Sequence, residues 1–146
     1  MLLALVALGS VGLLLELLLL EHFEDTPQLV PLALLVAALV ASIALAVRPT
    51  RLTVRAFQVV MVALIAGAGA GLYLHYRGNV EFEIETDATL RGLTLIWAAL
   101  RGATPTLAPG ALAQVGIIGL ILTYRHPRLP SVGSVRPPGA QAPLKE

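Results

Sequence analysis

Long apolar runs alternate with polar connections along this chain. Continuous runs cover residues 2–20 and 29–47, a third lies within 54–75, and a shorter fourth covers 109–124. At a rise of about 1.5 Å per residue, about 20 residues cross a hydrocarbon core of roughly 30 Å. The first three runs meet this length and the fourth nearly does. The pattern therefore predicts an all-α membrane protein, built as a bundle of four transmembrane helices.

A cleaved signal peptide is the competing interpretation of the first run. No Lys or Arg precedes the run, and it is long for the apolar part of a signal peptide, so we interpret it as a span. The four runs together form one predicted integral membrane domain, residues 1–126. Residues 127–146 are rich in Pro, Gly and Ser, which predicts an unpacked cytoplasmic tail.

The connection from 76 to 108 begins with a strictly alternating segment. In VEFEIET, residues 80–86, Phe82 and Ile84 fall on one side of an extended chain, and the glutamates fall on the other. This alternation predicts an external extended stretch. Because a lone strand leaves its backbone groups unpaired, we expect its apolar side to contact the membrane-embedded body or another chain.

The second half of this connection has helical spacing instead. Between about Ala88 and Arg101, apolar residues recur every three or four positions around Trp97. A short amphipathic helix with a central Trp and flanking Arg is typical of the membrane interface. A helix packed on the ends of the spans is the equal alternative.

Composition and charge support a membrane location and give an orientation. Mean hydropathy is +0.83 and 13% of residues are charged, whereas about a quarter are charged in soluble domains. Seven of the ten Lys and Arg residues lie either within 48–55 or beyond residue 124. The positive-inside rule then places both termini and the 48–55 connection in the cytoplasm and 76–108 outside a bacterial inner membrane.

Two histidines stand near acids at the predicted outer ends of spans. The chain has no Cys, so imidazole and carboxylate are its candidate metal ligands. Candidate ligands for a divalent cation such as zinc, manganese or iron are His22, His75, Glu21, Glu24, Glu81 and Glu83. None of their spacings matches a known ligand motif, and a polar boundary ordinarily carries such residues. Metal binding and simple exposure to water therefore both stay open.

Glu16 is the ionisable residue embedded in an apolar run. A charge in hydrocarbon is costly, so such residues are functional candidates by default. Pairing with His75, Arg77 or Arg101, or protonation, would be the structural explanation. The other runs offer no chain of ionisable groups for a proton path. The sequence also shows no nucleophile with a base and no phosphate-binding loop, so we expect no enzyme activity and no cofactor beyond a metal.

Small residues recur every four positions in the third run, including Gly67 and Gly71. Such a row lets another helix approach closely. The neighbour can be a helix of the same bundle or a partner, and the sequence does not decide.

Two stretches together resemble a known group of proteins. HYRGNVEFE at 75–83, and ATPTLAPG with the following residues to TYRHP within 103–127, are similar to a group of small, functionally uncharacterised bacterial polytopic membrane proteins. The resemblance covers most of residues 11–127. It implies a bacterial inner membrane and four spans, and it transfers no catalytic residue.

The expected function is therefore that of a non-enzymatic accessory or interaction subunit of a larger membrane assembly. We expect the lipid bilayer, and other membrane subunits or further copies of the chain, as partners, and no nucleic acid. The candidate contact residues are Phe82, Ile84, Trp97, Gly67 and Gly71. A metal-handling membrane protein that uses the His and carboxylate cluster is the alternative.

Overall fold

Helices account for all regular structure in the described part of the chain. The computed structural model describes residues 1–124, 126 and 127. Its helices are α1 (Leu2–Leu19), α2 (Thr26–Val47), α3 (Arg51–Thr86), α4 (Gly92–Leu100) and α5 (Gly110–Thr123). Three of them, α1, α2 and α3, are long and apolar enough to cross a membrane. The predicted all-α membrane class is confirmed at this level, and the tail predicted beyond Pro127 lies outside the described residues.

Local capping explains where α2 and α3 begin. The side-chain oxygen of Gln28 accepts the backbone N–H of Asp25 at 3.3 Å, so α2 starts three residues before the predicted span. At the start of α3, Thr50 and Thr53 each accept the other's backbone N–H, at 3.2 and 2.8 Å. Pro49, which lies between α2 and α3, has no backbone N–H and so cannot continue α2. The turn between α2 and α3 is therefore short and well defined.

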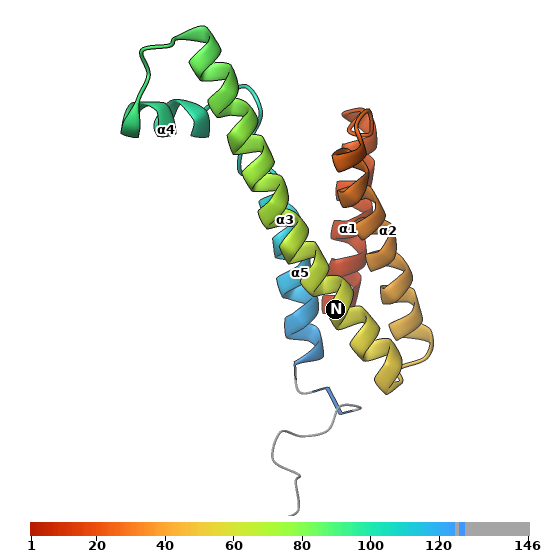
Figure 1. Ribbon diagram of the computed structural model, residues 1–146. Helices are drawn as coiled ribbons and strands as arrows, with labels where there is room; N and C mark the ends of the chain where they lie inside the picture. Colours follow the sequence, from red (N-terminus) through yellow and green to blue (C-terminus); the bar gives the residue numbers. More distant parts are fainter. Residues whose placement is uncertain (125, 128–146) are drawn as a thin grey trace, which may run out of the picture.

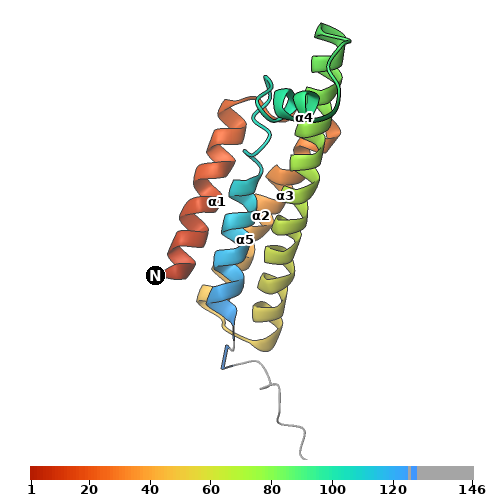
Figure 2. The same ribbon diagram turned by 90° about the vertical axis from the view of Figure 1, so that its left-hand side faces the viewer.

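Four of the helices form a closed ring (Figures 1 and 2). α1 packs against α2 and α5, and α3 packs against the same two helices. Chain direction alternates, so the α1–α2 turn, the end of α3 and α4 lie at one end of the bundle. The α2–α3 turn and the end of α5 lie at the other. We refer to these as the α4 end and the α2–α3 end.

Buried positions in the bundle recur at alternating intervals of three and four residues. On α2 and α3 they are Leu35, Ala38, Ser42, Leu45, Val54, Phe57, Met61, Leu64 and Ala68. This spacing is typical of helices that pack with side chains interlocked along a shared seam. The buried Ser42 hydroxyl donates to the carbonyl of Ala38 at 2.7 Å, and Ser10 donates to Val6 in the same way, so neither is left unpaired.

Close helix contacts depend on glycine. A Cβ on Gly67 would lie 2.7 Å from Leu34 of α2, and one on Gly71 would lie 3.1 Å from Pro109, just before α5. Gly116 of α5 is tighter, since its Cβ would lie 2.6 Å from the Met61 carbonyl oxygen. The row of small residues in the third run is therefore used inside the bundle, which is one of the two alternatives that the sequence left open for Gly67 and Gly71.

The predicted extended stretch is helical. α3 continues without a break to Thr86, so its 36 residues reach about 54 Å, well beyond a bilayer core. Arg77 and Glu81 form an ion pair at 2.8 Å across one turn, which requires helical spacing. A helix satisfies its own backbone hydrogen bonds, which a lone strand cannot do. The prediction of an extended segment over 80–86 was wrong for this reason.

The short helix after α3 is present but begins later than predicted. It was expected from about Ala88, yet the carboxylate of Asp87 accepts the backbone N–H of Thr89 at 2.9 Å and the Thr89 hydroxyl at 2.6 Å. These two hydrogen bonds lower the pKa of Asp87 and form a separate turn. α4 then starts at Gly92, whose φ of +55° glycine adopts without strain.

Candidate functional site

A buried asparagine fixes the structure at the α4 end. Asn79 of α3 is almost fully buried, and its amide nitrogen donates to the carbonyls of Ala99 and Thr104 at 2.9 and 2.7 Å. The same nitrogen lies 3.0 Å from the Thr106 hydroxyl, and the amide oxygen accepts the backbone N–H of Thr104 at 3.0 Å. One side chain thus binds the end of α4 and the following connection to α3.

Two further contacts hold the same connection. Gly102 passes so close to Asn79 that any Cβ there would overlap the amide. A ring nitrogen of His75, Nδ1, lies 3.0 Å from the carbonyl oxygen of Pro105. We call the outer part of α3 from residue 76, together with α4 and the connection to α5, the α4 platform. Its parts are joined by specific polar contacts.

The α4 helix turns an apolar stripe away from α3. Ala99 is buried against α3, whereas Leu93 is 83% and Trp97 62% exposed. Ile96 and Leu100 are also exposed, and together with Leu93 and Trp97 they recur every three or four residues along one side of α4. Both views place α4 at the level of the α1–α2 turn, lying across the direction of the bundle (Figures 1 and 2).

The end of α3 extends beyond that level. Figure 1 shows the last turns of α3 projecting past both the α1–α2 turn and α4. Phe82, which is 53% exposed, and Ile84 lie in this projection, among the acids at positions 81, 83, 85 and 87. The projection therefore combines exposed apolar side chains with a strongly acidic surrounding.

The structure brings together the two histidines but not the predicted cluster around them. The rings of His22, in the α1–α2 turn, and His75, on α3, lie with centroids 6.3 Å apart. Within the described residues, no group of three or more His, Cys, Asp or Glu is close enough to hold a metal ion. Glu81 pairs with Arg77 instead. The predicted ligands Glu21, Glu24 and Glu83 likewise join no such group.

Glu16 lies on the exposed side of α1. Within the described chain its side chain forms no hydrogen bond or ion pair, and so it does not pair with His75, Arg77 or Arg101 as the sequence suggested. Its neighbours on the same exposed side, Leu15 and Leu19, are apolar.

Sequence reasoning missed the residues that organise the platform. Asn79, Gly102, Thr104 and Thr106 carry no charge, and although three of them lie in the two stretches that carry the resemblance, 75–83 and 103–127, no role was assigned to them from the sequence. Asn79 meets partners that are 20 or more residues away along the chain, as in its contacts with Ala99 and Thr104. An isolated amide within a helix pattern gives no sign of which distant backbone it will meet.

The long apolar helices place this chain among helical membrane proteins, with an ordered platform at one end of the bundle. Comparisons with protein-family models, with curated proteins and with solved structures find no match to the chain. The predicted relationship to small bacterial polytopic proteins is tested by none of these comparisons and stays a prediction.

Proposed function

We propose that the chain crosses a bacterial inner membrane four times, with both termini in the cytoplasm and the α4 platform outside. The arginines of the α2–α3 end and the acids of the α4 end support this orientation. α5 has 14 residues, about 21 Å, which is short for a span. Its packing against both α1 and α3, and the hydrogen-bonded turn that precedes it, support a crossing shielded by neighbours.

In this arrangement α4 lies at the interface between the outer leaflet of the inner membrane and water. The level of the α1–α2 turn marks the outer ends of two spans, and α4 lies at that level with its apolar stripe exposed. Trp97 is the single tryptophan, so its fluorescence reports this position alone. Lipids brominated near the headgroup should quench it more strongly than lipids brominated near the chain ends. Equal quenching by the two lipids, or quenching by neither, would contradict an interfacial α4.

The protein acts as a non-enzymatic accessory subunit that binds another membrane protein through the projecting end of α3. One observation carries this proposal: Phe82 and Ile84 are exposed on the last turns of α3, which project past α4 and which the proposed orientation places outside the membrane. Exposed apolar side chains rimmed by polar ones mark interaction sites. Because the rim here is acidic, the partner should present a basic surface around an apolar contact.

The test is the size of the complex extracted in mild detergent from native membranes, measured by native mass spectrometry. A double substitution, Phe82→Ser with Ile84→Ser, should release the chain from a defined larger assembly. Leu107→Ser is the matched control, because Leu107 is also exposed at the α4 end but lies away from the projection. Retention of the same complex by the double variant would overturn the proposal, as would a wild-type chain that is always free.

A second function, divalent metal binding, is favoured by the contact between His22 and His75. A hydrogen bond from His75 Nδ1 to the Pro105 carbonyl, 3.0 Å away, would leave Nε2 free as a ligand. Two imidazoles 6.3 Å apart need only small movements to share a cation, and water would complete its coordination.

This function is tested by metal analysis of the purified chain and by zinc titration. His22→Ala with His75→Ala should abolish binding of about one ion per chain. His126→Ala is the control, because His126 lies beyond α5, at the α2–α3 end. Unchanged zinc binding by the double variant would exclude this pair as the site.

A further inference from the structure

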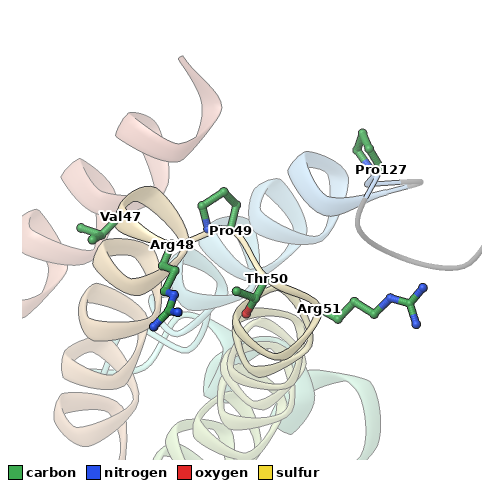
Figure 3. A pocket seen from close by; sticks show the side chains of 6 residues that line it. All are labelled: Val47, Arg48, Pro49, Thr50, Arg51 and Pro127. Carbon is green, nitrogen blue, oxygen red and sulfur yellow. The ribbon is translucent and has the colours of Figure 1, made fainter.

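The α2–α3 end of the bundle carries an open surface hollow that the proposed function does not use. Its volume is about 600 Å³. Figure 3 shows its lining residues, which are Val47, Arg48, Pro49, Thr50, Arg51 and Pro127. The side chains of Arg48 and Arg51 extend in different directions from the turn, so they do not form one closed clamp.

A second hollow of about 320 Å³ lies along α3 from this turn. It is lined by Arg55, Gln58, Val59 and Val62. Residues 51, 55, 59 and 62 follow one another at intervals of three and four, so they share one face of α3. Along this face, Arg51 and Arg55 come first and the exposed Val59 and Val62 follow. A lipid has the same order, with a charged headgroup followed by apolar chains.

The charge at this end is uncompensated within the described residues. The guanidinium groups of Arg48, Arg51 and Arg55 form no hydrogen bond or ion pair there. The acids of the described chain lie on α1 or at the α4 end. By contrast, Arg77 of the platform pairs with Glu81. The α2–α3 end thus presents three cations to any anion that reaches it.

We propose that this end binds an anionic glycerophospholipid. Its phosphate is held by Arg51 and Arg55, with Arg48 adding to the positive field, and an acyl chain lies along Val59 and Val62. The exposed valines favour a lipid over free phosphate, because an acyl chain can cover their apolar surface and a phosphate ion cannot. The site lies at the opposite end from the α4 platform and does not depend on the accessory role.

The test compares lipid retention in native mass spectrometry after exchange into mixed detergent and lipid. Phosphatidylglycerol should stay bound to the wild-type chain at concentrations where phosphatidylcholine does not. Each basic residue near an anionic headgroup contributes roughly a factor of five, so Arg51→Gln with Arg55→Gln should weaken retention on the order of 20-fold. The control is Arg77→Gln with Arg91→Gln, which should leave retention unchanged, because Arg77 is paired with Glu81 and Arg91 donates to the Leu90 carbonyl.

Two further measurements distinguish a bound lipid from a bound free anion. Val59→Ser with Val62→Ser should also reduce retention of phosphatidylglycerol, while inorganic phosphate at millimolar concentration should not displace the lipid. Displacement by phosphate would identify a free anion as the ligand and overturn the lipid assignment. Equal losses in the two arginine variants would show a general effect of charge and would overturn the site. Circular dichroism checks that each variant keeps its helix content.

Discussion

The side-chain amide of Asn79 lies directly against the backbone of Gly102. A Cβ built on Gly102 would come within 2.6 Å of Asn79 Cγ, closer than real Cβ atoms approach any neighbour. The amide cannot turn aside, because it is hydrogen-bonded to Ala99, Thr104 and Thr106 at the same time. The fixed amide and the missing side chain at 102 therefore depend on each other, and together they set the position of α4.

We expect Gly102→Ala to loosen α4 from α3. Because overpacking a filled site costs about 1–3 kcal/mol, amides of residues 92–106 should exchange roughly tenfold or more faster with deuterium. The control is Gly78→Ala, on the same stretch of α3, where a Cβ meets nothing within 4 Å. Gly78→Ala should be neutral or stabilising by up to about 1 kcal/mol, since Ala is the better helix former. Equal exchange in both variants would show that Gly102 is not tightly packed.

Asn79→Asp should have a larger effect on the same segment. An ionised carboxylate has no donor, so it would face the carbonyls of Ala99 and Thr104 as an unpaired acceptor. Leaving buried groups unsatisfied costs about 1–3 kcal/mol each, so protection of α4 should be lost while the bundle helices stay protected. Hydrogen exchange read helix by helix measures this difference. Full protection of α4 in the variant would mean that other contacts hold it.

Gly116→Ala tests the packing of α5 on α3. A Cβ at this position would lie 2.6 Å from the Met61 carbonyl oxygen, and a backbone atom cannot move aside as a flexible side chain can. We expect a loss of about 1–3 kcal/mol, seen as a lower melting temperature in mild detergent. Gly69→Ala is the matched control in α3, because its Cβ would meet nothing within 4 Å. A melting temperature unchanged by Gly116→Ala would argue against this close approach.

The membrane class of the fold could be read from the sequence, but its core could not. Run length alone indicates spanning helices, and α1 and α2 end within a few residues of their predicted limits. The buried face is different, because these helices are apolar all round. Leu35 is fully buried while Val36, next to it, is 49% exposed, and both are equally suited to lipid. Only the packing of neighbours distinguishes the two faces.

The candidate site was predicted in part and misread in part. The short helix with exposed Trp97 and the meeting of the two histidines follow from spacing and from the position of span ends. The alternation in VEFEIET led to the wrong prediction of an extended stretch, because a helix that projects from the bundle tolerates charge on all its sides. Asn79 was missed because its role is to hydrogen-bond the backbone of residues 99–106, and no local sequence pattern connects it with that segment.

Thr89→Val should raise the pKa of Asp87. In the native turn the Thr89 hydroxyl and backbone N–H lower this pKa, so the ionised carboxylate stabilises the turn at pH above the ordinary Asp value. That contribution is lost as pH falls through the lowered value. Removing the hydroxyl leaves the backbone bond, so the pKa should return only partway, as measured by carboxyl chemical shifts against pH. Thr94→Val, which removes a hydroxyl bonded to the Arg91 carbonyl, should leave the Asp87 titration unchanged.

Glu16→Leu should stabilise the isolated chain. Glu16 lies on the exposed side of α1 among leucines, where a carboxylate in the bilayer has lipid as its surroundings. The cost is about 2.5–3.5 kcal/mol at the centre of a span and less near an end, so we expect a gain of about 1–2 kcal/mol in bilayer unfolding measurements. Glu85→Leu, in the projection of α3 that the proposed orientation places outside the membrane, should bring no such gain. A loss of stability in Glu16→Leu would instead show an intramolecular partner for the carboxylate. The variant chain can also be more stable in isolation while its native complex dissociates more readily. That result would show that Glu16 contacts a donor or cation on a partner helix, which this chain does not supply.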